Sequence, residues 1–192
     1  MREKNDGTDS IEMSVCTAMF SYDLIQKNQI RFHSEREFIS EDIIFDFDYY
    51  PLSKKVCVSN SVGYCYCDNE GSLTTKYLLN RFDMQKKLTK ELLLRSKDLD
   101  IYELCKDRIA TTFLSIVRYC AKLEVKFSYN NGKAEAKKRI LKMCQDEMVQ
   151  SILSEYNNKQ VPLKSRIINI CIKRKLSNLI WLIMKVKIKL NI

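Results

Sequence analysis

The fold prediction starts from one stretch near the N-terminus, Ile39-Ser40-Glu41-Asp42-Ile43-Ile44-Phe45. Ser40 is a favourable N-cap, because its hydroxyl can accept a hydrogen bond from a free amide of the first helical turn. Glu41 and Asp42 place negative charge at the positive end of the helix dipole. Apolar residues then recur at roughly helical spacing until Pro51 stops the run. The stretch therefore predicts a helix over residues 40–52 that opens with two adjacent carboxylates.

These two carboxylates have two interpretations. A carboxylate at a helix start can act as a general base and take a proton from a substrate hydroxyl, if a pocket lies against it. In that interpretation Asp42 is the base and Glu41 is its neighbour in the site. Acids in a first helical turn are also ordinary capping charges without any catalytic role. Spacing alone leaves both interpretations open.

The carboxylate pair lies within an ordered series of short segments. In chain order these are residues 14–25, Asn28-Gln29-Ile30-Arg31-Phe32, the stretch quoted above, Lys54-Lys55-Val56-Cys57-Val58, Gly63-Tyr64-Cys65-Tyr66 and Asn69-Glu70-Gly71-Ser72-Leu73-Thr74. This order resembles the second half of the catalytic domain of family 2 glycosyltransferases, inverting enzymes that use nucleotide sugars to build bacterial surface polysaccharides. In that family an Arg-Phe segment leads into a Glu-Asp motif at a helix start. A Lys-Lys-Ile/Val strand, a Tyr-x-Tyr strand and a Gly-Ser-Ile/Leu-Thr loop follow it.

The resemblance implies an α/β fold of the GT-A type. In this chain it would be an α+β fragment with a few short strands, followed by a mostly α-helical C-terminal region. It implies that Asp42 deprotonates the acceptor hydroxyl and that Glu41 helps to position the site. It also makes Tyr66, Ser72 and Thr74 candidate substrate contacts, although they could form only a sheet edge and a turn. The implied partners are a nucleotide sugar and a polysaccharide or lipid-linked glycan acceptor.

Two departures from the family pattern limit this implication. Cys67 stands where the family commonly has an arginine that could help to hold a diphosphate. Only thirteen residues precede Ser14, so the family's nucleotide-binding half and its metal-binding Asp-x-Asp motif are not in this sequence. We therefore expect a hexosyltransferase-like chain that is incomplete and inactive alone. It would be a truncated reading frame, a remnant, or a fragment that needs a partner to supply the nucleotide-binding half. No cofactor is expected in this chain, and Mg²⁺ or Mn²⁺ would bind only with the missing half.

The sequence contains no pattern typical of a metal site. Its eight cysteines are scattered, and the closest pair, Cys65 and Cys67, lacks the two-residue gap of zinc ligands. Asp46 and Asp48 match Asp-x-Asp, but residues two apart in a helix point about 200° from each other. Free thiols and the absence of a signal-peptide pattern at the N-terminus predict a cytoplasmic protein.

Composition divides the chain into four segments. Residues 1–10 are polar and are predicted to be a disordered start, and residues 11–75 would form the partial catalytic domain. Residues 76–158 show helical spacing of apolar residues, and residues 159–192 form a basic tail. Only 4 glycines and 2 prolines occur in the whole chain, which favours long helices.

The tail carries the whole net charge of +9, because no acidic residue follows Glu155. The basic residues after that position are Lys159, Lys164, Arg166, Lys173, Arg174, Lys175, Lys185, Lys187 and Lys189. One continuous helical face is predicted from residues that are three or four positions apart: Ile168, Ile172, Leu176, Leu179, Ile183, Val186 and Leu190. The longest apolar run, residues 179–184 with Trp181, is too short to span a bilayer.

A basic amphipathic helix with a central tryptophan is typical of segments that lie on an anionic membrane. Residues 162–192 therefore predict peripheral binding at the inner face of the cell membrane. Packing of the apolar face on the other helices stays open, as does nucleic-acid binding, which is the least favoured of the three. The alternative to sugar transfer is thus a non-enzymatic helical module that binds a membrane surface through its basic tail.

Overall fold

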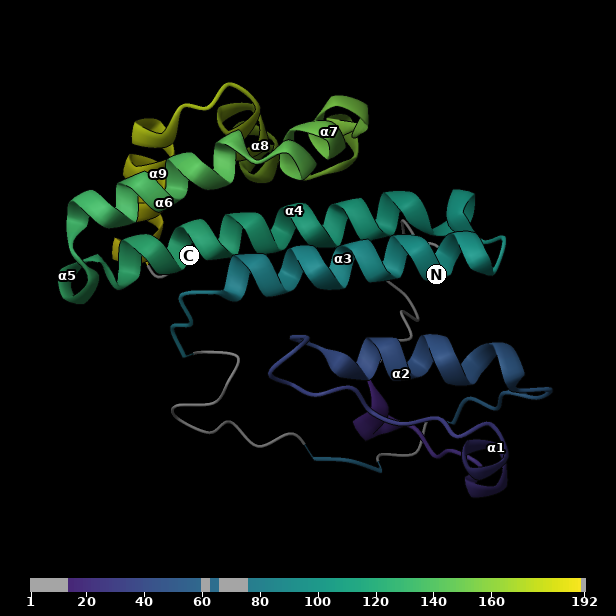
Figure 1. The fold of residues 1–192 in the computed structure, drawn as a ribbon. Coiled ribbons are helices and arrows are strands. Elements are labelled where there is room, and N and C mark those ends of the chain that lie inside the picture. The colour runs from purple at the N-terminus through teal and green to yellow at the C-terminus, as the bar shows by residue number, and fades with distance from the viewer. Residues whose placement is uncertain (1–13, 60–62, 66–75, 191–192) are drawn as a thin grey trace.

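The computed structural model describes residues 14–59, 63–65 and 76–190 of the chain. In these residues every regular element is a helix, and no β-strand is present (Figure 1). The α-helices are α1 (Tyr22–Lys27), α2 (Glu41–Tyr49), α3 (Arg81–Asp98), α4 (Tyr102–Lys126), α5 (Ser128–Asn131), α6 (Lys133–Gln145), α7 (Glu147–Glu155), α8 (Leu163–Lys173) and α9 (Ser177–Lys189). The short 3₁₀ helices are η1 (Val15–Thr17), η2 (Tyr50–Leu52) and η3 (Asn158–Gln160).

The predicted α/β fold, a partial GT-A-like domain with a few short strands, is wrong for the described residues. Two β-rich runs, residues 56–58 and 63–65, belong to the described chain, and neither forms a strand. A two-stranded hairpin is only marginally stable by itself. No other described segment supplies a strand on which these runs could pair. Their β-propensity is therefore not expressed, because it depends on packing within a sheet.

The helix predicted over residues 40–52 is present as α2, and η2 follows it directly. Ser40 precedes this helix in the left-handed conformation, with φ of 70°, and its side chain makes no capping hydrogen bond. Phe45 of α2 meets Phe20 edge to face, with ring centroids 5.2 Å apart, which ties α2 to the segment before α1. A small cluster joins α2 to the long helices and consists of Phe38, Ile44, Leu88, Leu92 and Ile109.

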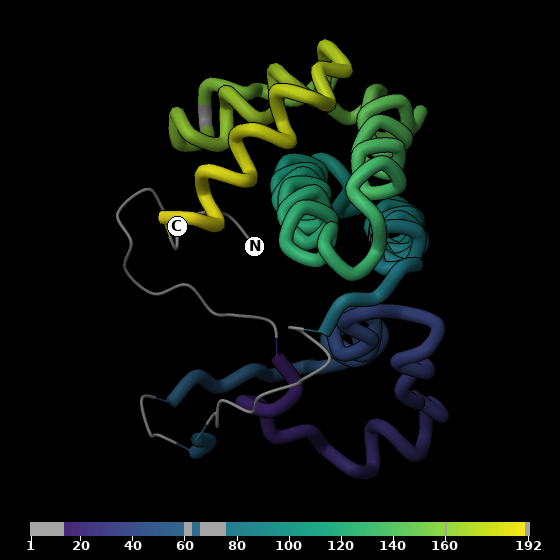
Figure 2. Tube along the Cα trace, turned by 90° about the vertical axis from the view of Figure 1, so that its left-hand side faces the viewer, coloured from purple at the N-terminus to yellow at the C-terminus, as the bar shows by residue number. Residues whose placement is uncertain are grey.

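The central element of the larger helical bundle is α4. Helix α3 runs along one side of it, and α6, α8 and α9 pack on its other sides (Figures 1 and 2). The main core is formed by buried side chains from α4 and α6 to α9, among them Phe113, Leu114, Val117, Ile140, Val149, Ile172, Ile180 and Met184. The basic tail is therefore part of the folded body, because one side of α8 and one side of α9 are buried in the main core.

The predicted continuous helical face of the tail is divided between the core and the surface. Helix α8 ends at Lys173, and Lys175 adopts a left-handed conformation with φ of 56° before α9 begins. This turn changes the direction of the chain, so residues spaced by three or four across it no longer share a face. Ile168 and Ile172 are buried, whereas the later members Leu176, Leu179, Val186 and Leu190 are exposed.

Candidate functional site

The predicted catalytic pair lies in the first turn of α2, where both side chains are partly exposed. The Oδ1 atom of Asp42 accepts a hydrogen bond from the backbone N–H of Ile43, at 3.0 Å. This contact is the local capping interaction that acids make at a helix start. The predicted substrate contacts Tyr66, Ser72 and Thr74 lie outside the described residues. The structure therefore places the two carboxylates next to each other. It does not describe where they lie relative to Tyr66, Ser72 and Thr74.

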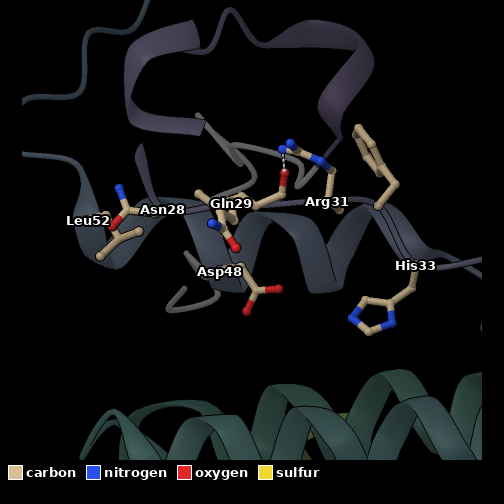
Figure 3. Close-up of a pocket in the computed structure, with 8 residues that line it drawn as sticks. Asn28, Gln29, Arg31, His33, Asp48 and Leu52 are labelled. Carbon is tan, nitrogen blue, oxygen red and sulfur yellow. Dashed lines mark hydrogen bonds between the residues drawn. The ribbon is translucent and has the colours of Figure 1, made fainter. Parts of the chain in front are cut away.

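A pocket of about 500 Å³ opens beside the other end of α2 (Figure 3). Its lining residues are Asn28, Gln29, Ile30, Arg31, Phe32, His33, Asp48 and Leu52, and neither carboxylate of the predicted pair is among them. Asp48 forms an ion pair with Arg95 of α3, and the Nε atom of Arg95 also donates to Glu91 at 3.0 Å. The acid in this pocket is therefore held by the fold, and the pocket does not present Asp42 to a substrate.

Asp46 is the most unusual acid of α2, because it is buried and its two carboxylate oxygens have no hydrogen-bond partner. Burial, and to a smaller extent the nearby charge of Asp42, raises the pKa of this carboxyl from its ordinary value of 3.8 to about 6. Within the described part of the chain, no group of acidic, cysteine or histidine side chains is arranged to hold a metal ion. Asp46 is therefore a destabilising buried acid, which the sequence pattern did not reveal.

The second candidate is a surface on α8 and α9 that exposes eight large apolar residues. We call it the apolar surface, and it consists of Leu163, Ile167, Ile170, Leu176, Leu179, Leu182, Val186 and Leu190. On each helix its members are three or four positions apart, so they line one side of the helix. The opposite sides are buried in the main core through Ile168, Cys171, Ile172, Ile180, Trp181 and Met184.

Trp181 lies on the buried side of α9, with only 8% of its surface exposed. The Nζ atom of Lys137 on α6 lies 5.7 Å from the centroid of its ring. This tryptophan therefore packs in the core and does not face outward. Sequence reasoning missed Leu182, which is 56% exposed and points about 100° away from Trp181 around the helix axis. Counting the helical repeat from Ser177, where α9 begins, would have separated these two sides.

Every charged residue on α8, on α9 and in the turn between them is basic. Lys173, Arg174 and Lys175 are exposed at the turn, and Lys189 is exposed near the end of α9. No helix in the described residues is both long and apolar enough to cross a bilayer. The arrangement is a folded helical hairpin that exposes apolar side chains and whose charged residues are all basic.

Comparison of the chain with protein-family models, with curated proteins and with solved structures finds no match. Together with the helical structure, this result contradicts the predicted membership of the family 2 glycosyltransferases. Sugar transfer, binding of a nucleotide sugar and a divalent metal in a completed site stay predictions that no observation tests. The cytoplasmic location is a prediction of the same kind.

Proposed function

We propose that this chain is a helical module that docks on an anionic membrane surface through the apolar surface of α8 and α9. The observation that carries this proposal is the exposure of eight large apolar side chains on two packed helices that carry no acid. Contiguous exposed apolar side chains rimmed by charge are typical of interaction surfaces. The single sign of the charge favours an anionic partner.

The expected affinity comes from two contributions of similar size. Full burial of one Leu or Ile side chain is worth roughly 1.5–3 kcal/mol, so inserting the exposed part of each residue gives about 1 kcal/mol. Each Lys or Arg near an anionic membrane adds about 1 kcal/mol, and salt screens this term. Binding should therefore depend both on the apolar side chains and on the ionic strength.

A membrane surface suits this hairpin better than nucleic acid does. Contacts to nucleic acid come mainly from Lys and Arg side chains that reach phosphates. On α8 and α9 the outermost side chains include Leu163, Leu182 and Leu190, each more than half exposed. Such residues would gain by insertion among lipid headgroups. The buried opposite sides of both helices hold the apolar surface in place without any partner.

Co-sedimentation of the full chain with vesicles tests this proposal. Vesicles of phosphatidylcholine mixed with phosphatidylserine should bind the protein, and vesicles of phosphatidylcholine alone should bind it weakly. The double variant Leu182→Ser, Val186→Ser should lose most of the binding. The matched control Leu94→Ser, Leu104→Ser changes two exposed leucines on α3 and α4 and should bind as the wild type does.

Two results would overturn membrane docking. One is equal sedimentation of the Leu182 and Val186 variant and its control. The other is a wild-type dimer that becomes a monomer in the same variant, because the apolar surface would then bind a second copy of the chain. Binding to an oligonucleotide but not to vesicles would show that the basic residues recognise nucleic acid and not a membrane.

A further inference from the structure

Asp46 is a buried acid on a helix whose other acids reach solvent. Of the four acids of α2, Asp46 alone is buried, with 1% of its surface exposed. Neither of its carboxylate oxygens has a hydrogen-bond partner. Burial of an unpaired polar group is unfavourable, and burial of its charged form is much more so. The packed structure therefore tolerates a neutral carboxyl at this position better than a carboxylate.

The side of α2 that carries Asp46 is covered by Phe20. The ring of Phe20 meets Tyr49 edge to face, with centroids 4.7 Å apart, and its centroid lies 6.3 Å from that of Tyr50. These two tyrosines follow Asp46 by three and four positions, so they lie beside it on the same side of the helix. The backbone N–H of Ser21 donates to the hydroxyl of Tyr49 at 2.8 Å, which attaches the chain there.

This cover is part of a short segment, residues 14–27, which we call the N-terminal flap. It contains η1, which packs against α2, and α1. Neither helix has a buried residue, and Val15, Leu24 and Ile25 are only partly buried against α2. Figure 1 shows α1 on the side of α2 that faces away from α3. Segments with few buried contacts open at a low free energy, so the flap can leave α2 while the bundle stays folded.

The residues close to Asp46 offer no positive charge to a carboxylate. Asp42, one turn earlier on α2, is the charged group that acts on Asp46, and its negative charge opposes ionisation. In the flap, η1 and residues 18–21 carry no charge, and Cys16 is their titratable group. Asp23 and Lys27 of α1 are exposed to solvent.

The cations of α3 near α2 are engaged with other acids. Arg95 pairs with Asp48, which points about 200° away from Asp46 around the helix axis. Lys87 pairs with Glu37. Helix α3 therefore compensates acids on its own side of α2 and leaves the flap side without a counterion.

The segment that passes along α2 before it begins also has two titratable cations, and both have other contacts. The Nη1 atom of Arg31 donates to the carbonyl of Ile30 at 2.7 Å. The Nδ1 atom of His33 lies 4.0 Å from the Oε2 atom of Glu37. Among the described residues, an ionised Asp46 thus gains most from contact with water.

We propose that Asp46 is a proton-controlled switch: its neutral carboxyl keeps the N-terminal flap closed over α2, and its ionisation favours a state in which the flap is open. On ionisation the proton passes to solvent, and water then reaches the carboxylate through the open flap. The switch uses no residue of α8 or α9, so it does not rest on membrane docking.

The direction and size of the effect follow from the proton affinities of the two states. In the closed state the pKa of Asp46 is about 6, and in the open state it returns towards its ordinary value of 3.8. Between about pH 4 and about pH 6 the open state loses its proton first. The ratio of open to closed molecules should rise about tenfold per pH unit there, about a hundredfold in total, and stay level at higher pH.

Hydrogen–deuterium exchange of the full chain, from about pH 4 to about pH 8, tests the switch. Protection factors correct each rate for the pH dependence of intrinsic exchange. Protection of α1 reports on the flap, because a helix of six residues is not stable once it leaves its support. In the wild type, this protection should fall about a hundredfold as the pH rises through about 6.

Three variants separate the proton from the other contacts of the flap. Asp46→Asn carries no charge, so its protection of α1 should not depend on pH. The control Asp23→Asn makes the same change at an exposed acid of the flap and should keep the wild-type fall. Tyr49→Phe removes the hydrogen bond to Ser21, so it should lower protection by about threefold to tenfold at every pH and keep the shape of the wild-type profile.

Three results would overturn the switch. One is protection of α1 in the wild type that does not change with pH. Another is the same fall in Asp46→Asn as in the wild type. The third is equal protection of α1 and α4 at every pH, because Asp46 would then reach water only when the whole protein unfolds.

Discussion

The Nε atom of Arg139 on α6 donates a hydrogen bond to the Oε2 atom of Glu124 on α4, at 2.8 Å. Glu124 is only 4% exposed, and its other oxygen accepts a hydrogen bond from the hydroxyl of Tyr77. This pair connects the central helix to the helix that covers it.

Removal of Arg139 should destabilise the protein strongly. Arg139→Gln leaves the Glu124 carboxylate buried without its cation, and losing one partner of a buried ion pair costs about 3 kcal/mol or more. Urea unfolding at neutral pH measures this loss. The control Lys138→Gln changes the adjacent exposed residue and should stay within about 0.5 kcal/mol of the wild type. The double variant Glu124→Leu, Arg139→Met should recover most of the stability, and failure to recover it would show that the ion pair is not the cause.

Asp46→Asn should change how stability depends on pH. The folded pKa of about 6 lies above the ordinary value of 3.8, so the folded state holds its proton more tightly than the unfolded state. The contribution of Asp46 to stability is therefore most favourable below about pH 4 and is lost as the pH rises through about 6, a change of up to about 3 kcal/mol. Denaturant unfolding across this range should show that Asp46→Asn removes the decline. Asp23→Asn, at an exposed acid of α1, should keep the wild-type profile.

Sequence reasoning located α2 and its first turn because acids, apolar spacing and Pro51 all indicate the same local structure. It failed over residues 56–58 and 63–65, because β-propensity is expressed only when other strands complete a sheet. Asp42 was correctly placed at a helix start. Its relation to a pocket depends on how α2 packs, and the local sequence carries no information on that.

The tail shows a second limit of sequence reasoning. Lys175 ends α8 in a left-handed conformation that usually requires glycine, so the sequence gives no signal for this turn. Because the sequence does not reveal the turn, the predicted apolar face runs from Ile168 straight into α9. It therefore mixes residues that are buried with residues that are exposed.

Lys175→Gly should stabilise the turn between α8 and α9. The backbone N–H of Lys175 donates to Ile172 and that of Leu176 donates to Cys171, each at 2.9 Å, which closes the end of α8. Glycine adopts the required positive φ without steric penalty, so we expect a gain of about 0.5–1 kcal/mol in the free energy of unfolding. Lys173→Gly, within the last turn of α8, should instead lose a similar amount. Equal changes in urea unfolding of both variants would contradict this description of the turn.

Tryptophan fluorescence can distinguish the two sides of α9. Trp181 is the only tryptophan and packs in the main core, whereas the next residue, Leu182, is exposed. If the apolar surface inserts among headgroups and the fold is kept, the emission maximum of the wild type should not shift when anionic vesicles are added. In the variant Trp181→Phe, Leu182→Trp, the new indole leaves water on binding, so its emission should move to shorter wavelength. A shift in the wild type of the same size would mean that α9 turns its core side towards the membrane, and the apolar surface would lose its assigned role.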